Sequence, residues 1–156
     1  MGQFLRALRA PRTKPIPARP AALLNAREIQ LFERMAGFDQ AHSLAVYRGL
    51  REIDPDGVDL QVAGLLHDVG KGLPSLAQRI AFVLTSAVWP KSLERWATIP
   101  PRSFRGGLWA LSHHAEAGAR FLEAAGSRPR VAEIVREQGK SDDPDTALLA
   151  RIDSRC

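Results

Sequence analysis

Hydrophobic and polar positions follow a helical period along most of this chain. In the clearest case, small or apolar side chains recur at i, i+3, i+4 and i+7, the spacing of one buried face of an α-helix. These positions are Leu60, Ala63, Gly64 and His67. Asp68 follows directly, and then Gly70 and Gly72, which permit a sharp turn of the backbone. The pattern predicts a helix that carries His67 on its buried face and ends at Asp68.

Two further predicted helices carry histidines. One begins near Asp39, a good N-cap residue, and turns His42 toward the core. Its inward stripe consists of His42, Ala45, Val46, Gly49, Leu50 and Ile53. The other runs from about 104 to 125 and has an inward stripe of Leu111, His114, Gly118 and Phe121. His113 is rotated about 100° from His114, so His114 is the stronger candidate for a buried site.

The rest of the chain also favours helices. Residues 80–88 could pass for a strand, but apolar positions from Leu76 onward keep helical spacing until Trp89-Pro90 breaks it. The further predicted helices are residues 76–87, 92–98, 129–138 and a last one that begins at Pro144 after a cap at Asp142 or Asp143. With 156 residues and 45% hydrophobic ones, the chain can form one core. We therefore predict an all-α, single-domain helical bundle of about six to seven helices.

Inward-facing polar side chains need partners inside a core. Asp153 lies on the side of the last predicted helix that carries Leu149 and Ala150, so it is inward-facing like His42, His67 and Asp68. Imidazole nitrogens and carboxylate oxygens are ligands of divalent metals, and one cation would satisfy all four residues together. The alternative is that each buried histidine only forms a hydrogen bond to a neighbour. The convergence of four such residues favours a metal site.

These residues, in this order and each in a helix, resemble the HD-domain metal-dependent phosphohydrolase superfamily of the HD/HDIG type. The segment AGLLHDVGKG, residues 63–72, is close to the most typical segment of that family. The segment HAEAGARFLEAAG, residues 114–126, is similar to the H-x-E-x-G-A helix of the subgroup that holds two metals. The resemblance covers roughly residues 26–156 and implies an HD-domain-like fold.

The resemblance also implies roles for single residues. His42, His67, Asp68 and Asp153 would bind a first ion, Asp68 would bridge, and His114 would reach a second ion. Asp68 and Lys71 are the implied catalytic residues, with Lys71 helping to bind phosphate. For Lys71 the alternative is an interaction with the dipole at the C-terminal end of its helix. The implied cofactor is a divalent transition metal, namely manganese, iron, nickel or cobalt, with magnesium as a further option.

One position departs from the two-metal pattern. In two-metal relatives a further histidine comes from the next helix, where this chain has Gln138 on the stripe of Val131, Ile134 and Val135. An amide oxygen is a weaker and harder ligand than imidazole, so we expect one firmly bound ion and a weak or absent second. The alternative is that Gln138 is a surface residue at a helix end, next to a C-cap at Gly139.

The predicted function is a metal-dependent phosphohydrolase that cleaves a phosphate ester or anhydride, for example of a nucleotide, by a metal-activated water. The expected partner is thus a small phosphorylated, nucleotide-like substrate. The first alternative is a catalytically weak HD-like module for ligand binding or regulation. A di-iron oxygenase is a weaker alternative, because it needs the complete ligand set that Gln138 interrupts.

The net charge of +5 resides in the first 24 residues. They contain five basic residues, no acidic residue and four prolines, whereas basic and acidic residues balance over 25–156. We therefore divide the chain into a basic, Pro-rich N-terminal arm, residues 1–24, and an HD-like metal-binding domain, residues 25–156. The arm is either a solvated tail or a contact for nucleic acid or an anionic membrane.

The expected location is the cytoplasm. The chain lacks an apolar stretch long enough for a signal peptide or a membrane span. Its single cysteine, Cys156, excludes an intramolecular disulfide and agrees with a reducing compartment. The Arg- and Ala-rich composition suggests a bacterial source. The sequence does not define the oligomeric state.

Overall fold

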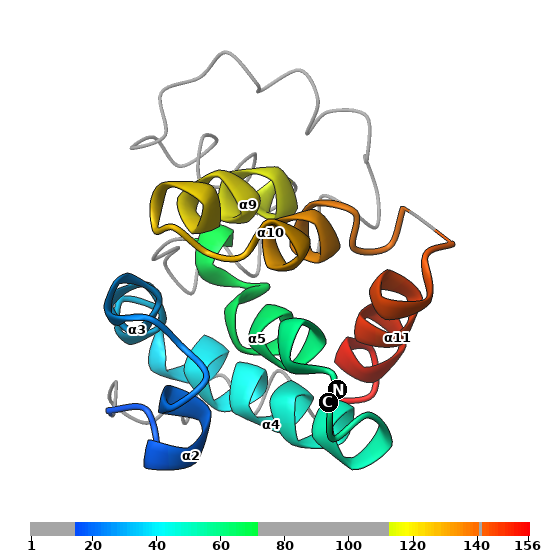
Figure 1. Ribbon diagram of the computed structural model, residues 1–156, viewed down its shortest axis with the longest axis horizontal. Helices are drawn as coiled ribbons and strands as arrows, with labels where there is room; N and C mark the ends of the chain where they lie inside the picture. The colour runs from blue at the N-terminus through cyan, green and yellow to red at the C-terminus, as the bar shows by residue number, and fades with distance from the viewer. Residues whose placement is uncertain (1–14, 72–112, 141) are drawn as a thin grey trace, which may run out of the picture.

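The computed structural model describes residues 15–71, 113–140 and 142–156. Within these residues there are seven α-helices, one short 3-10 helix and no strand (Figure 1). The helices are α2 Ala18–Ala21, α3 Ala26–Glu33, α4 Gly37–Ile53, α5 Val58–Leu66, the 3-10 helix η1 Val69–Lys71, α9 His114–Ala124, α10 Pro129–Arg136 and α11 Pro144–Asp153. The all-α prediction is confirmed. Four parts of the prediction lie outside the described residues: the helices at 76–87 and 92–98, the first part of the helix predicted from about 104 to 125, up to residue 112, and Gly72.

Helix α5 occupies the centre of the described bundle. It contacts α3, α4, α10 and α11, and in Figure 1 it lies between α4 and the α9–α10 pair. Every residue from Leu60 to Gly70 is buried, so the prediction of a one-sided helix is too narrow here. Neighbours on all sides remove the solvent face, which explains the nearly continuous apolar sequence of α5. The helix ends at Leu66, and the predicted buried position of His67 at this end is confirmed.

Helix α4 begins earlier than predicted. Its first residue is Gly37 and its N-cap is Ala36, so Asp39 lies inside the first turn, buried, and the prediction of Asp39 as N-cap is wrong. Val46 and Leu50 are fully buried as the stripe predicts, but Ile53 at the last position is 51% exposed. The inward stripe therefore stops one turn before the helix does.

The segment after Asp68 packs directly on the first turn of α9. A Cβ atom at Gly70 would lie 1.9 Å from the carbonyl oxygen of His114 and 2.5 Å from the backbone nitrogen of Gly118. Gly70 does not have a positive φ angle, so it is not the sharp-turn residue that we predicted. Its lack of a side chain instead permits two backbones to approach closely, which brings His114 next to η1.

Helix α9 buries a slightly different face from the predicted one. Its helical backbone begins at His114, with His113 as the N-cap. Gly118 is buried as expected, but Phe121 is 48% exposed and Leu122 is fully buried instead. Leu122 lies four positions after Gly118, whereas Phe121 lies three positions after it. The buried face of α9 therefore follows the i, i+4 spacing here, and the sequence pattern had suggested i, i+3.

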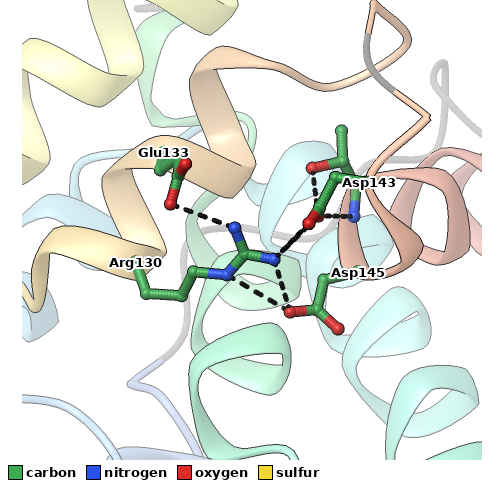
Figure 2. Close-up of polar contacts among 5 residues, drawn as sticks. Arg130, Glu133, Asp143 and Asp145 are labelled. Carbon is green, nitrogen blue, oxygen red and sulfur yellow. Dashed lines mark hydrogen bonds and ion pairs between the residues drawn. The ribbon is translucent and has the colours of Figure 1, made fainter.

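Arg130 of α10 binds the start of α11. Figure 2 shows its guanidinium among three carboxylates, those of Glu133, Asp143 and Asp145. Nη2 donates to both Asp143 oxygens at 2.8 and 2.7 Å and to Asp145 Oδ2 at 2.8 Å, while Nη1 donates to Glu133 at 3.0 Å. Asp143 is also the N-cap of α11, as predicted: its carboxylate accepts the backbone N–H of Thr146. These bonds fix the beginning of the helix that ends at Asp153.

The described end of the predicted arm contacts the domain. Pro20 in α2 is buried, and Ile16, Leu23 and Leu24 are partly buried against the hydrophobic core. Residues 16–24 therefore contribute apolar contacts to the bundle. None of the described helices combines the length and the apolar character needed to cross a bilayer.

Candidate metal centre

Three side chains from two helices meet at one point. His42 comes from α4, and His67 and Asp68 are the two residues that directly follow α5, which packs on α4. One ligand atom of each lies within 4.8 Å of the others. The two imidazole rings are 5.4 Å apart between centroids and meet edge to face. The structure thus brings together three of the predicted metal ligands.

The orientation of His67 is set by its own helix. Nδ1 lies 3.0 Å from the carbonyl oxygen of Gly64, and because a carbonyl only accepts, Nδ1 carries the proton and donates. Nε2 is then left with its lone pair, is buried and has no hydrogen-bond partner in the described part of the chain. A second hydrogen bond that fixes the tautomer is the usual arrangement for a histidine that ligates metal. Burial lowers the pKa of His67, but the carboxylates of Asp68 and Asp153 outweigh it and raise the pKa above its ordinary value.

The two oxygens of Asp68 have different surroundings. Oδ2 accepts a hydrogen bond from Lys71 Nζ at 2.7 Å. Oδ1 is buried, lies 3.3 Å from His67 Nε2, and has no hydrogen-bond partner among the described residues. Burial raises the pKa of Asp68, but the charges of His67 and Lys71 together lower it below its ordinary value. Asp68 is therefore a buried carboxylate with one oxygen directed at the imidazole of His67.

Asp153 reaches the same point from the last residue of α11. Its Oδ1 is 2.6 Å from His42 Nε2 and 3.4 Å from His67 Nε2. Burial raises the pKa of this carboxyl, but the hydrogen bond with His42 and the close contact with His67 hold it well below its usual range. Asp153 thus stays an anion in contact with both predicted histidine ligands.

The donor set fits a divalent cation. Two imidazole nitrogens and two carboxylates suit manganese, iron, nickel, cobalt or zinc better than they suit calcium. Two of the buried atoms, His67 Nε2 and Asp68 Oδ1, have no hydrogen-bond partner among residues 15–71, 113–140 and 142–156, and buried polar atoms are normally satisfied. The side chains of His67 and Asp68 are each 1% exposed, whereas those of His42 and Asp153 are 14% and 31% exposed. The point at which they meet is therefore closed on the α5 side and accessible on the α4–α11 side.

His114 lies toward the Asp68 side of this group. It opens α9, which packs on η1, and its charge contributes to lowering the pKa of Asp68. His113 is the N-cap of the same helix and forms no side-chain cap hydrogen bond. The preference for His114 over His113 and the role of His114 at a second ion remain predictions.

Gln138 has a partner that the sequence did not indicate. Its Nε2 donates to Asp153 Oδ2 at 3.0 Å, and its Oε1 is buried. Gln138 is half-buried, lies just after α10 and precedes Gly139, which has the predicted left-handed conformation with φ of +74°. The predicted place at a helix end is thus confirmed, but the side chain is bonded to Asp153 and is not simply solvated. Residues 138 and 153 lie just after α10 and at the end of α11. No sequence periodicity relates two such ends, so only the fold could reveal the contact.

Comparison with curated proteins and with solved structures finds no match to this chain. The comparison with family models does find one, to the HD domain over residues 40–154. This range includes His42, His67, Asp68 and Asp153, the four side chains that meet in the structure, and it spans most of the chain. The chain therefore belongs to the HD domain family, within the superfamily of HD-domain metal-dependent phosphohydrolases.

Proposed function

We propose that this protein is a metal-dependent phosphohydrolase that cleaves a phosphate ester or anhydride of a small, nucleotide-like molecule. The observation that carries the proposal is the meeting of His42, His67 and Asp68, with Asp153 in contact, in a chain of the HD domain family. Of these, His67 Nε2 and Asp68 Oδ1 are buried without hydrogen-bond partners in the described part of the chain. Those atoms are available as ligands.

The chain's own residues have distinct proposed roles. A divalent ion held by these four side chains would supply a Lewis acid that lowers the pKa of water and offsets charge on a phosphoryl group. Asp68 would hold that ion with Oδ1 while Oδ2 keeps the ammonium group of Lys71 in place at 2.7 Å. The Lys71 side chain is 24% exposed, so it can present positive charge to an incoming phosphate.

A metal and substrate screen tests the proposal. Purified protein is analysed for bound metal, reloaded separately with Mn²⁺, Co²⁺, Ni²⁺ and Fe²⁺, and assayed for phosphate release from nucleoside mono-, di- and triphosphates, dinucleoside polyphosphates and sugar phosphates. Metal-dependent release from one class of substrate, lost in Asp68→Asn, is expected. Bound metal without turnover of any of these substrates would contradict the hydrolase proposal and favour a binding or regulatory module. Oxygen consumption by the iron-loaded protein would favour an oxygenase.

A further inference from the structure

Gln138 joins the end of α10 to the last residue of α11. Its side-chain amide lies 3.0 Å from Oδ2 of Asp153, and a carboxylate oxygen only accepts hydrogen bonds. The amide must therefore present its NH2 group to Asp153, which settles the orientation of an otherwise ambiguous side chain. Its Oε1 is buried although the residue as a whole is half-buried, so protein covers the oxygen of the amide while the nitrogen is bonded to Asp153.

The hydrogen bond from Gln138 divides the two oxygens of Asp153. Oδ2 is occupied by the amide, whereas Oδ1 faces the imidazoles of His42 and His67 at 2.6 and 3.4 Å. A carboxylate with one oxygen already bonded to a fixed donor is held to one-oxygen contact with an ion on its other side. Without the donor, the same carboxylate could rotate and offer both oxygens.

Asp68 shows the same division of its oxygens. Lys71 occupies Oδ2 at 2.7 Å, and Oδ1 faces His67 Nε2. The two carboxylates of the centre thus each have one oxygen directed inward and one bonded to a donor from outside the ligand set. In metal sites such donors orient the ligands and often change affinity as strongly as a weak ligand does.

Resting on the proposed metal centre, we propose that Gln138 is a positioning residue that holds Asp153 as a one-oxygen ligand. This role differs from that of a substitute for a second-ion histidine, because the amide acts on a first-ion ligand by donating a hydrogen bond. It also gives the last turn of α11 a second attachment to the α10 region, at the opposite end from the Arg130 cluster.

The test measures metal affinity in the absence of substrate. Gln138→Leu removes the donor at similar size, and Lys140→Leu introduces the same side chain at an exposed position two residues later. Co²⁺ is titrated against a competing chelator, and its visible absorption spectrum reports the ligand geometry. Gln138→Leu should bind Co²⁺ about 10–100-fold more weakly with a changed spectrum, while Lys140→Leu matches the wild type. Circular dichroism and melting of the metal-free variants establish that both are folded, and Gln138→Met takes the place of Gln138→Leu if that variant does not fold.

Gln138→His separates the two roles of this position. An imidazole N–H can replace the amide as donor, so affinity within a few-fold of the wild type with an unchanged number of ions supports positioning. An additional Co²⁺ ion per chain would assign the position to a second metal site and overturn the inference, as would wild-type affinity and spectrum in Gln138→Leu. Absence of phosphatase activity in the wild type contradicts the proposed function alone, because these measurements need no substrate.

Discussion

His42 of α4 and Asp153 of α11 are 111 positions apart in sequence, yet Nε2 of the histidine lies 2.6 Å from Oδ1 of the aspartate. This contact ties the last residue of the last helix to a long helix of the N-terminal half. Because α11 also packs on α5, whose C-cap is His67, the three helices meet where the polar side chains converge. The position of the chain's final helix is thus part of the candidate metal centre.

We predict that Asp68→Asn and His67→Ala each lower the affinity for Mn²⁺ or Co²⁺ by more than about 100-fold and abolish hydrolysis, since a ligand matters more than a donor that orients it. Metal content after dialysis and phosphate release measure the two effects. His113→Ala serves as the control and should retain both, because His113 is rotated about 100° from His114 around the helix axis and is not among the predicted metal ligands. Equal losses for His113→Ala and His114→Ala would contradict the choice of His114.

Gly70→Ala should destabilise the protein by about 1–3 kcal/mol, the usual cost of overpacking. The new Cβ would meet backbone atoms of His114 and Gly118, which cannot rotate away as a side chain can. Gly118→Ala is the matched control: its Cβ would lie 3.4 Å from the nearest atom, an ordinary contact, and alanine favours a helix interior by about 0.5–1 kcal/mol over glycine. Urea unfolding of the two variants should therefore differ in sign, and equal effects would contradict the close approach of η1 to α9.

The Arg130 cluster predicts an acid-sensitive contribution to stability. The hydrogen bond from Arg130 lowers the pKa of Asp143 from its ordinary value of 3.8 to about 2. Since the folded state has the lower pKa, this stabilisation is present above pH 3.8 and is lost as the pH falls toward 2. Thermal melts of the wild type and Asp143→Asn should differ at neutral pH and converge near pH 2. The Asp143 side chain is 30% exposed and screened by solvent, so the difference should be modest and should shrink in about 1 M salt. A salt-independent difference would argue against an electrostatic origin.

The charge of the basic arm and its contacts with the core can be tested separately with two truncations. Deleting residues 1–14 removes four of its five basic residues and lowers the formal net charge from +5 to +1. Any salt-sensitive binding to nucleic acid or anionic vesicles should then disappear, because most of the positive charge of the arm is gone. Deleting residues 1–24 should in addition destabilise the domain, because Pro20 is buried and Leu23 and Leu24 pack on the core. Sedimentation with anionic vesicles, filter binding of DNA and thermal melts compare the two truncations, and vesicle or DNA binding that survives the shorter deletion would argue against the arm as its source.

Sequence periodicity predicted α4, α5, α9, α10 and α11 and the inward direction of the four candidate first-ion ligands, but it did not predict α2 and α3. His42, His67, Asp68 and Asp153 each stand on or next to an apolar stripe, and a polar residue on such a stripe must be satisfied inside the fold. Periodicity failed at helix ends, as at Ile53 and Phe121, because a stripe does not show where the neighbouring element stops covering it.

Contacts between helix ends could not be predicted at all. Gln138 meets Asp153, and Arg130 meets Asp143, because α10 and α11 adopt a particular relative orientation that no single helix specifies. The function of Gly70 was likewise misjudged. A glycine needed for close approach and a glycine needed for a turn look alike in sequence, and only the backbone of α9 distinguishes them.

Metal binding should stabilise the C-terminal turn of α11 but not its first turn. Arg130 holds the first turn of α11, whereas Asp153 in the last turn is held by His42, His67 and Gln138. An ion at 100 times its dissociation constant stabilises the folded state by about 2.7 kcal/mol. Because the last turn of a terminal helix tends to fray, an ion bound to a residue in that turn should hold the turn in place. Hydrogen exchange with and without Co²⁺ should show protection gained at 150–156 and around His67, with residues 144–147 nearly unchanged. Identical exchange of 150–156 in both states would show that Asp153 is not a ligand that organises the terminus.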